Sequence, residues 1–194
     1  MSLICGLVPR DREEKVADML VRDIRSRDYA ITAGDIGHPF VVAALMRYGQ
    51  DDILNRMTNI TDRPGYGYQV VHGATARTEE WDGPEPGNQH GSQNHLMLGS
   101  IEEWFYGGLA GIGSIRKAEQ GEELLLAPYL ADDIDEVSAW TTYPCGRTAL
   151  SWKRTDKTHV EIKIEIPPNM KARLKAGTLE RCFGSGNYTV TIEQ

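Results

Sequence analysis

The residues best suited to chemistry lie within 73–95, a glycine-punctuated stretch that gathers carboxylates, an indole and imidazoles. They are Glu79, Glu80, Trp81, Asp82, His90 and His95. Carboxyl groups can move the protons of a glycosidic bond, and an indole can stack on a sugar ring. The cluster therefore favours carbohydrate chemistry, on a stretch interrupted by a proline- and glycine-rich loop over 83–93.

A solvated surface is the alternative interpretation of two adjacent glutamates. Neighbouring strand residues point to opposite faces, so at most one of Glu79 and Glu80 is expected to enter a given pocket. A zinc site is disfavoured. The spacings between His72, His90 and His95 are eighteen and five residues, which fit no compact ligand pattern, and no cysteine lies nearby.

Composition excludes several classes of partner. The formal net charge of −7 and the lack of a basic run argue against nucleic acid, whose phosphates need clustered cations. No apolar run approaches the roughly 18 residues of a membrane span. The start of the chain lacks the features of a signal peptide, and three widely spaced cysteines suggest free thiols, so a cytoplasmic location is expected if the chain stands alone.

Helical periodicity dominates the first part of the chain, up to about residue 113. Helices are expected over 11–26, 39–48, 51–60 and 94–106. The second of these is apolar nearly all round and should be deeply buried. Asp51 is the expected N-cap of the third, and a short extended run is expected over 68–71.

The remainder, 114–194, alternates with a period near two. Strands are expected over 123–127, 136–142, 148–153, 159–166 and 188–192, with turn residues between them. This order of helices first and strands second predicts an α+β chain of two parts, the second an antiparallel β-sandwich.

Read together, the motifs resemble the carboxy-terminal end of the α-L-rhamnosidase family, glycoside hydrolase family 78. They run in the family's order along nearly the whole chain. They are GLVP at 6–9, TAGDIGHPF at 32–40, PGYGY at 64–68, GAT at 73–75, TEEWDG at 78–83, SQNH at 92–95, Gly99, Glu103 with Trp104, LAGI at 109–112, YPCG at 143–146, SWK at 151–153, IPP at 166–168 and GSGNY at 184–188.

This resemblance implies the later helices of an (α/α)6 barrel over 1–113, followed by a β-sandwich over 114–194. It also implies inverting hydrolysis of terminal α-L-rhamnosides without a redox or nucleotide cofactor. Glu79 takes the position of the family's general base and His95 that of a sugar-contacting histidine, with Trp81 and Tyr66 as further substrate-binding positions. The chain departs from the family at two positions. The family more often has arginine at the position of Glu80 and tryptophan at the position of Tyr66.

The resemblance places the family's general acid upstream of anything in this sequence. The chain is therefore expected to be a fragment that is inactive alone and that associates with itself or with a chain supplying the missing barrel half. A non-catalytic carbohydrate-binding or assembly subunit is the alternative. A stand-alone hydrolase pairing Glu79 with Asp82 or Glu80 is disfavoured, because inversion needs carboxyl groups about 6.5–9.5 Å apart.

Overall fold

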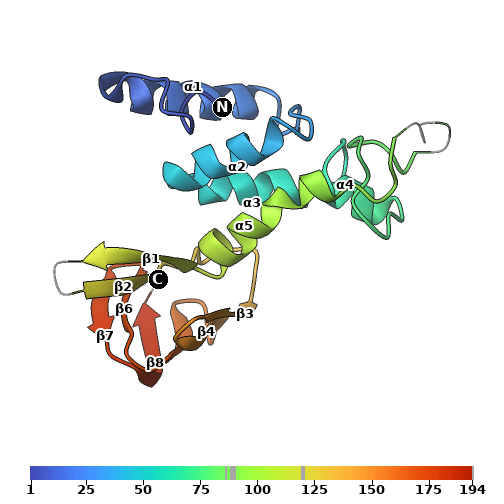
Figure 1. The fold of residues 1–194 in the computed structure, drawn as a ribbon. Coiled ribbons are helices and arrows are strands. Elements are labelled where there is room, and N and C mark those ends of the chain that lie inside the picture. Colours follow the sequence, from blue (N-terminus) through green and yellow to red (C-terminus); the bar gives the residue numbers. More distant parts are fainter. Residues whose placement is uncertain (86, 88–90, 119–120, 194) are drawn as a thin grey trace. The chain divides into compact units, whose positions relative to one another are not determined.

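The computed structural model describes residues 1–85, 87, 91–118 and 121–193, and the side chains of 114–122 are not described. His90, one of the residues weighed as a metal ligand, lies outside this part. The chain forms two compact units, Met1–Trp104 and Phe105–Gln194, called here the helical unit and the sheet unit (Figure 1). The boundary between the units follows Trp104, which is nine residues (113 − 104) before the boundary expected from the change in periodicity. The first strand begins at Ile112.

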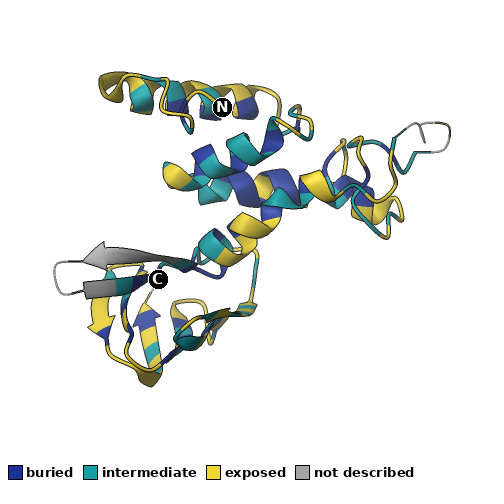
Figure 2. Ribbon diagram, in the orientation of Figure 1, coloured by how far each residue is buried: buried dark blue, intermediate teal, exposed yellow. Residues whose placement is uncertain are grey.

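The helical unit contains three of the four expected helices with shifted ends, whereas the helix expected over 94–106 is a run of short 3₁₀, α and π segments that continues into the sheet unit. Its elements are η1 (Arg10–Arg12), α1 (Glu13–Ser26), α2 (His38–Arg47), α3 (Asp51–Asn59), α4 (Tyr66–Val71), η2 (Leu96–Ile101) and α5 (Glu102–Trp104). Buried positions concentrate on α2 and α3 (Figure 2). Ile53, Leu54 and Met57 bury one face of α3, which is the stripe that a 3.6-residue period predicts.

Two expectations about these helices are corrected. Helix α2 is only partly buried, with Val42, Ala44 and Leu45 in the core and much of its remaining surface half-exposed. Asp51 is not an N-cap, since Gln50 holds that position without a side-chain cap. Asp51 instead accepts a hydrogen bond of 2.9 Å from the indole of Trp104. Burial raises the pKa of Asp51, and this hydrogen bond opposes the shift.

Residues 68–71, expected to be extended, belong to helix α4. The Val70-Val71 pair favours a strand locally, but tertiary packing overrides that preference. A Cβ atom at Gly67 would lie 2.6 Å from the carbonyl oxygen of Ile60, so only glycine allows α4 to approach the end of α3 this closely. Gln69 and Tyr68 are buried in the resulting contact.

The sheet unit is a sandwich of two four-stranded sheets that follows a short π-helical segment, η3 (Phe105–Leu109). One sheet has the order β1-β2-β6-β7 and the other β3-β4-β5-β8. The strands are β1 (Ile112–Ala118), β2 (Gly121–Leu126), β3 (Glu136–Tyr143), β4 (Gly146–Arg154), β5 (His159–Ile166), β6 (Lys171–Ala176), β7 (Leu179–Phe183) and β8 (Gly186–Glu193).

The shared core of the sandwich comes from alternate strand residues, including Leu150, Trp152, Ile162 and Ile164. The second sheet is antiparallel, as expected. In the first sheet β2 pairs with β6 in parallel, which corrects the expectation of a wholly antiparallel sandwich. The sequence reasoning also missed β1, β7 and β6. The buried positions of β6 are Ala172, Leu174 and Ala176, and its pattern is weak because two of the three are small.

Among the described residues, no helix combines the length and apolarity that crossing a bilayer requires.

Candidate active site

Glu79 and His95 lie side by side because two backbone hydrogen bonds tie their segments together. The amide of Glu79 donates to the carbonyl of Ser92 at 2.8 Å, and the amide of His95 donates to the carbonyl of Arg77 at 2.7 Å. The 3.9 Å separation of Glu79 Oε2 from His95 Nδ1 follows from this pairing. The structure thus brings together the two residues that the sequence singled out for base and sugar contact.

The Glu79 carboxylate is held but not enclosed. Its Oε2 accepts the backbone N–H of Ser92 at 2.9 Å, and 45% of the side chain remains exposed. A Cβ atom at Gly91 would lie 3.1 Å from both Cβ and Oε2 of Glu79. The returning loop therefore needs a glycine to pass so close to this carboxylate, which stays open to water and to a ligand.

Asp35 completes a row of three titratable side chains. Its Oδ2 lies 3.7 Å from Nε2 of His95, whereas Glu79 approaches the Nδ1 atom of the same ring. The other oxygen, Oδ1, accepts the backbone N–H of Ile36 at 2.8 Å, which fixes the carboxylate in the loop before α2. Sequence reasoning gave Asp35 no role, although it lies in the quoted TAGDIGHPF motif. Each nitrogen of the His95 imidazole therefore faces a carboxylate, and the two negative charges orient the ring.

An aromatic wall of three rings packs beside this row. Tyr66 and Trp81 meet edge to face with centroids 4.9 Å apart, and the ring of His38 lies 5.1 Å from Trp81 and 5.6 Å from Tyr66. The indole of Trp81 donates to the carbonyl of Ala33 at 2.9 Å, and the hydroxyl of Tyr66 donates to the carbonyl of Leu98. Both side chains are half-buried, so the wall fixes the loops that carry Asp35 and Glu79.

The buried members of this wall are kept neutral. Burial lowers the pKa of His38 to about 4, and the side chain is 1% exposed. Burial also raises the pKa of the Tyr66 hydroxyl above its ordinary value. An uncharged imidazole and phenol beside Trp81 give the wall an apolar character, which suits the C–H face of a sugar.

A buried amide sets the conformation of the residues next to Glu79. Gln69 Oε1 accepts the backbone N–H of Thr78 at 3.2 Å, and its Nε2 donates to the carbonyl of Glu80 at 3.1 Å. The hydroxyl of Thr78 donates to the same carbonyl at 2.6 Å. Glu80 itself is exposed, and it is Glu79 that the structure brings to His95.

Of the histidines weighed as zinc ligands, the two that the structure describes, His72 and His95, have different partners. His72 stacks on Tyr68 with centroids 3.9 Å apart, and its Nδ1 lies 2.9 Å from the carbonyl oxygen of Tyr68. The phenol of Tyr68 bonds to Glu85 in turn, which raises the pKa of that phenol to about 12. In the described part of the chain, no group of three His, Cys, Asp or Glu side chains is arranged to hold a metal ion.

The sequence matches two domain families. Residues 1–109 match the family described as bacterial alpha-L-rhamnosidase 6 hairpin glycosidase domain, and 119–182 match bacterial alpha-L-rhamnosidase C-terminal domain. An alpha-L-rhamnosidase of Streptomyces avermitilis is 26% identical over 179 residues, and one of Alteromonas sp. is 24% identical over 177 residues. These alignments cover 90% and 89% of the chain but 17% and 19% of the relatives, so the chain spans under a fifth of their length.

Solved structures show the same fold. The alpha-L-rhamnosidase of Aspergillus terreus superposes with a TM-score of 0.86, over 98% of this chain and 23% of that one. The Streptomyces avermitilis enzyme, solved with L-rhamnose, superposes with a TM-score of 0.85, over 98% of this chain and 21% of that one. The Dictyoglomus thermophilum enzyme superposes with a TM-score of 0.83, over 100% of this chain and 25% of that one. All three enzymes are 24% identical to this chain in sequence. The predicted fold class, helices of a six-hairpin barrel followed by a sandwich, is confirmed.

Proposed function

Because the chain belongs to the bacterial α-L-rhamnosidase six-hairpin glycosidase family, we propose that Glu79 and His95 form the water-activating side of a site that hydrolyses terminal α-L-rhamnosides. The observation that carries the proposal is the 3.9 Å approach of His95 to the Glu79 carboxylate. In this proposal Glu79 is the general base and His95 contacts the sugar. The substrate class comes from the relatives' names, and the residue roles come from the geometry together with the family resemblance.

The proposed chemistry is an inversion at the anomeric carbon. Glu79 takes a proton from a water molecule as that water attacks the carbon, while the bond to the leaving oxygen breaks on the opposite face. His95 donates a hydrogen bond to a sugar hydroxyl from Nδ1, the nitrogen on the Glu79 side, because Nε2 is buried on the Asp35 side. The wall of Tyr66 and Trp81 lies against the apolar side of the ring, and no metal or redox cofactor enters any step.

The leaving oxygen needs an acid as well, and the family resemblance implies that this acid belongs to the other half of the barrel. Each of the two proton transfers contributes typically 10²- to 10⁴-fold to the rate. Asp35 is a poor substitute because its carboxylate is directed to His95 and to the Ile36 amide. The proposed activity of the 194 residues alone is therefore negligible, and turnover requires a second chain or segment.

Two measurements on the purified chain test this proposal. Backbone amide NMR should detect weak L-rhamnose binding at the amides around Glu79 and His95, which His95→Ala abolishes there and Glu79→Gln retains, because amide and carboxylate both fit the site. Release of an aryl group from an aryl α-L-rhamnoside should stay at background. Turnover that Glu79→Gln removes would identify the base but refute the claim of inactivity, whereas equal binding in wild type and His95→Ala would refute the site.

An assembly subunit is the second candidate function, and exposed apolar side chains favour it. Val70 on α4 is 70% exposed and Leu96 on η2 is 80% exposed. These two elements are neighbours, since the Tyr66 hydroxyl on α4 bonds to the carbonyl of Leu98 on η2. Large apolar side chains left in water on adjoining elements mark surfaces that another chain covers. This function and the base-carrying role are compatible.

A further inference from the structure

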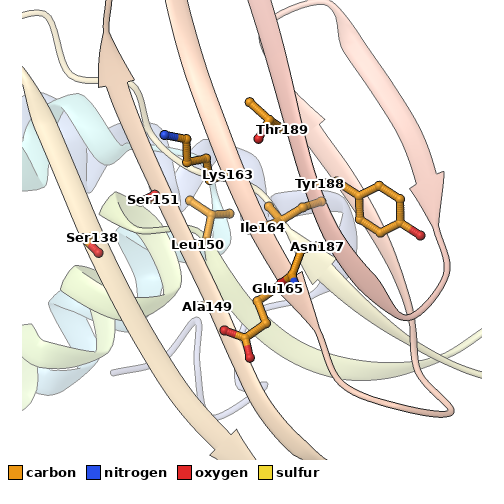
Figure 3. A pocket seen from close by; sticks show the side chains of 10 residues that line it. All are labelled: Ser138, Ala149, Leu150, Ser151, Lys163, Ile164, Glu165, Asn187, Tyr188 and Thr189. Atoms are coloured by element: carbon orange, nitrogen blue, oxygen red, sulfur yellow. The ribbon is translucent and has the colours of Figure 1, made fainter.

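The outer face of the sheet β3-β4-β5-β8 carries a hollow in the sheet unit that the proposed reaction does not use. Its volume is about 330 Å³, and ligand pockets occupy about 300–1,000 Å³. Residues of all four strands line it (Figure 3). Leu150 and Ile164 line it although their side chains are buried in the core, so the sheet backbone forms its floor.

Strand register explains why this face is hollowed. Directly opposed residues form two rows across the four strands. The first row is Trp140, Ala149, Glu165 and Asn187, and the second is Ser138, Ser151, Lys163 and Thr189. Ala149 and Ser151 on β4 are short, while Trp140 on one side and the β5 side chains on the other are long. The depression therefore lies over the short residues of β4, with polar side chains of β5 and β8 at its rim. Trp140 does not itself line it but is directly opposite the lining residue Ala149 in the register.

Trp140 differs from the other tryptophans of the chain. Trp104 and Trp152 are each 1% exposed and Trp81 is half-buried, whereas Trp140 is 56% exposed. The guanidinium of Arg147 lies 5.2 Å from the centre of the indole and orients it. A large aromatic ring held in water beside a hollow is typical of a binding surface, because its burial by a ligand is favourable.

The charges of this face favour a neutral ligand. Each cation is paired. Lys163 Nζ lies 2.9 Å from Glu161 Oε1, and Arg147 Nε lies 3.8 Å from Glu165 Oε2. An anion would have to break these pairs, and a cation would meet Lys163 at the rim. Within the described part of the chain, no hydrogen bond engages the hydroxyls of Ser138, Ser151 or Thr189, which leaves three donor-acceptor groups for a ligand.

We propose that this face binds a neutral glycosyl unit of a carbohydrate, with the apolar side of the sugar ring on Trp140 and its hydroxyls at Ser151, Glu165 and Asn187. An indole beside convergent hydroxyl, amide and carboxylate groups is complementary to a pyranose, which has one C–H-rich face and a polar edge. The site lies entirely in the sheet unit and is independent of Glu79. It would hold a glycan near the enzyme without reacting with it.

Titration of the full chain with neutral methyl glycosides, followed by backbone amide NMR, tests the proposal. The probes are methyl α-L-rhamnoside, α-D-mannoside, α-D-glucoside and β-D-galactoside, at millimolar concentrations. At least one should shift the amides of β3, β4, β5 and β8. Trp140→Ala should weaken that binding about tenfold, a loss of stacking worth roughly 1.4 kcal/mol. Ser151→Tyr should abolish it by filling the hollow, and Trp140→Phe should retain most of it.

Separate outcomes apply to the two sites. Binding that disappears in His95→Ala but persists in Trp140→Ala and Ser151→Tyr would assign all carbohydrate affinity to the candidate active site and overturn this inference. If none of the four glycosides shifts the amides of β3, β4, β5 and β8, the inference is also overturned. Since Trp140 and Ser151 are on the outer face, circular dichroism should show their variants folded.

Discussion

Glu79 Oε2 lies 3.9 Å from Nδ1 of His95, although sixteen residues (95 − 79) separate the two in the chain. This approach depends on the backbone bonds between the segments and on Gly91, which lets the loop fold back over the carboxylate. The geometry of the candidate base is thus set mainly by main-chain contacts. Substitutions that disturb the main chain here should act on Glu79 as strongly as substitutions of its neighbours.

Gly91→Ala should displace the Glu79 carboxylate. The added Cβ would lie 3.1 Å from Glu79 Cβ and Oε2, so the side chain must move and the hydrogen bond from the Ser92 amide weakens. Faster hydrogen exchange at the Ser92 amide is the expected result. Gly184→Ala is the control, because a Cβ added at that glycine would meet nothing within 4 Å. Unchanged exchange at Ser92 would contradict the proposed contact.

Trp81→Phe should destabilise the helical unit by about 1 kcal/mol, the usual net value of one hydrogen bond. The indole N–H that bonds to the carbonyl of Ala33 is lost, while most of the aromatic contact remains. Urea unfolding measures the change. The same substitution at Trp140, which is 56% exposed, should leave stability within the error of the method. Equal effects of the two would argue against the Trp81 bond.

His38 should make the helical unit less stable in mild acid. Its pKa is about 4 when folded and 6.5 ordinarily. Between these values the unfolded state binds a proton that the folded state does not, so stability rises with pH across this window. The stability that the neutral, buried His38 contributes is fully present above pH 6.5 and is lost as the pH drops toward 4. The loss from about pH 7.5 to about pH 5 should be about 2 kcal/mol.

His38→Phe tests that assignment, because phenylalanine keeps the packing against Tyr66 and Trp81 and has no titrating group. Urea unfolding of this variant should lose most of the stability change across the same pH interval. A steep acid dependence that survives in His38→Phe would assign the effect to other groups.

The purified chain should self-associate through α4 and η2. Leu96 and Val70 are the most exposed large apolar side chains of these elements, at 80% and 70%. The double variant Val70→Lys, Leu96→Lys should be monomeric, because two charges oppose burial of this surface. Light scattering gives the mass. A wild-type monomer at every concentration would refute the prediction, and Met19→Lys on α1, where Met19 is 59% exposed, is the matched control.

The expected location of exposed apolar surface is corrected by the structure. An incomplete barrel would leave helix 39–48 and the face of Trp104 and Phe105 without neighbours. Phe105 is 36% exposed, but Trp104 is 1% exposed and bonds to Asp51. The apolar residues of α2 are likewise partly covered by the described chain. The described chain therefore covers Trp104 and the buried residues of α2, and the prediction of association depends mainly on Val70 and Leu96.

Periodicity located α1, α2, α3 and most strands because each buries one face, and burial is what the hydrophobic pattern records. It failed at α4, where a close approach at Gly67 decides the conformation, and at β6, where small residues weaken the pattern. Glu79 and His95 could be named from their motifs. Asp35 and Gln69 could not be assigned roles, since these arise only when segments distant in sequence meet.

The parallel pairing of β2 with β6 has a consequence for synthesis of the chain on the ribosome. Glu123 pairs with Lys171, 48 residues (171 − 123) further along, so the β1-β2 hairpin waits with one edge open while the whole β3-β4-β5 meander is made. Closing so long a loop is slow compared with forming a hairpin. An open strand edge is a template for pairing with other chains. Aggregation during translation should thus be governed by how soon residues 171–174 emerge.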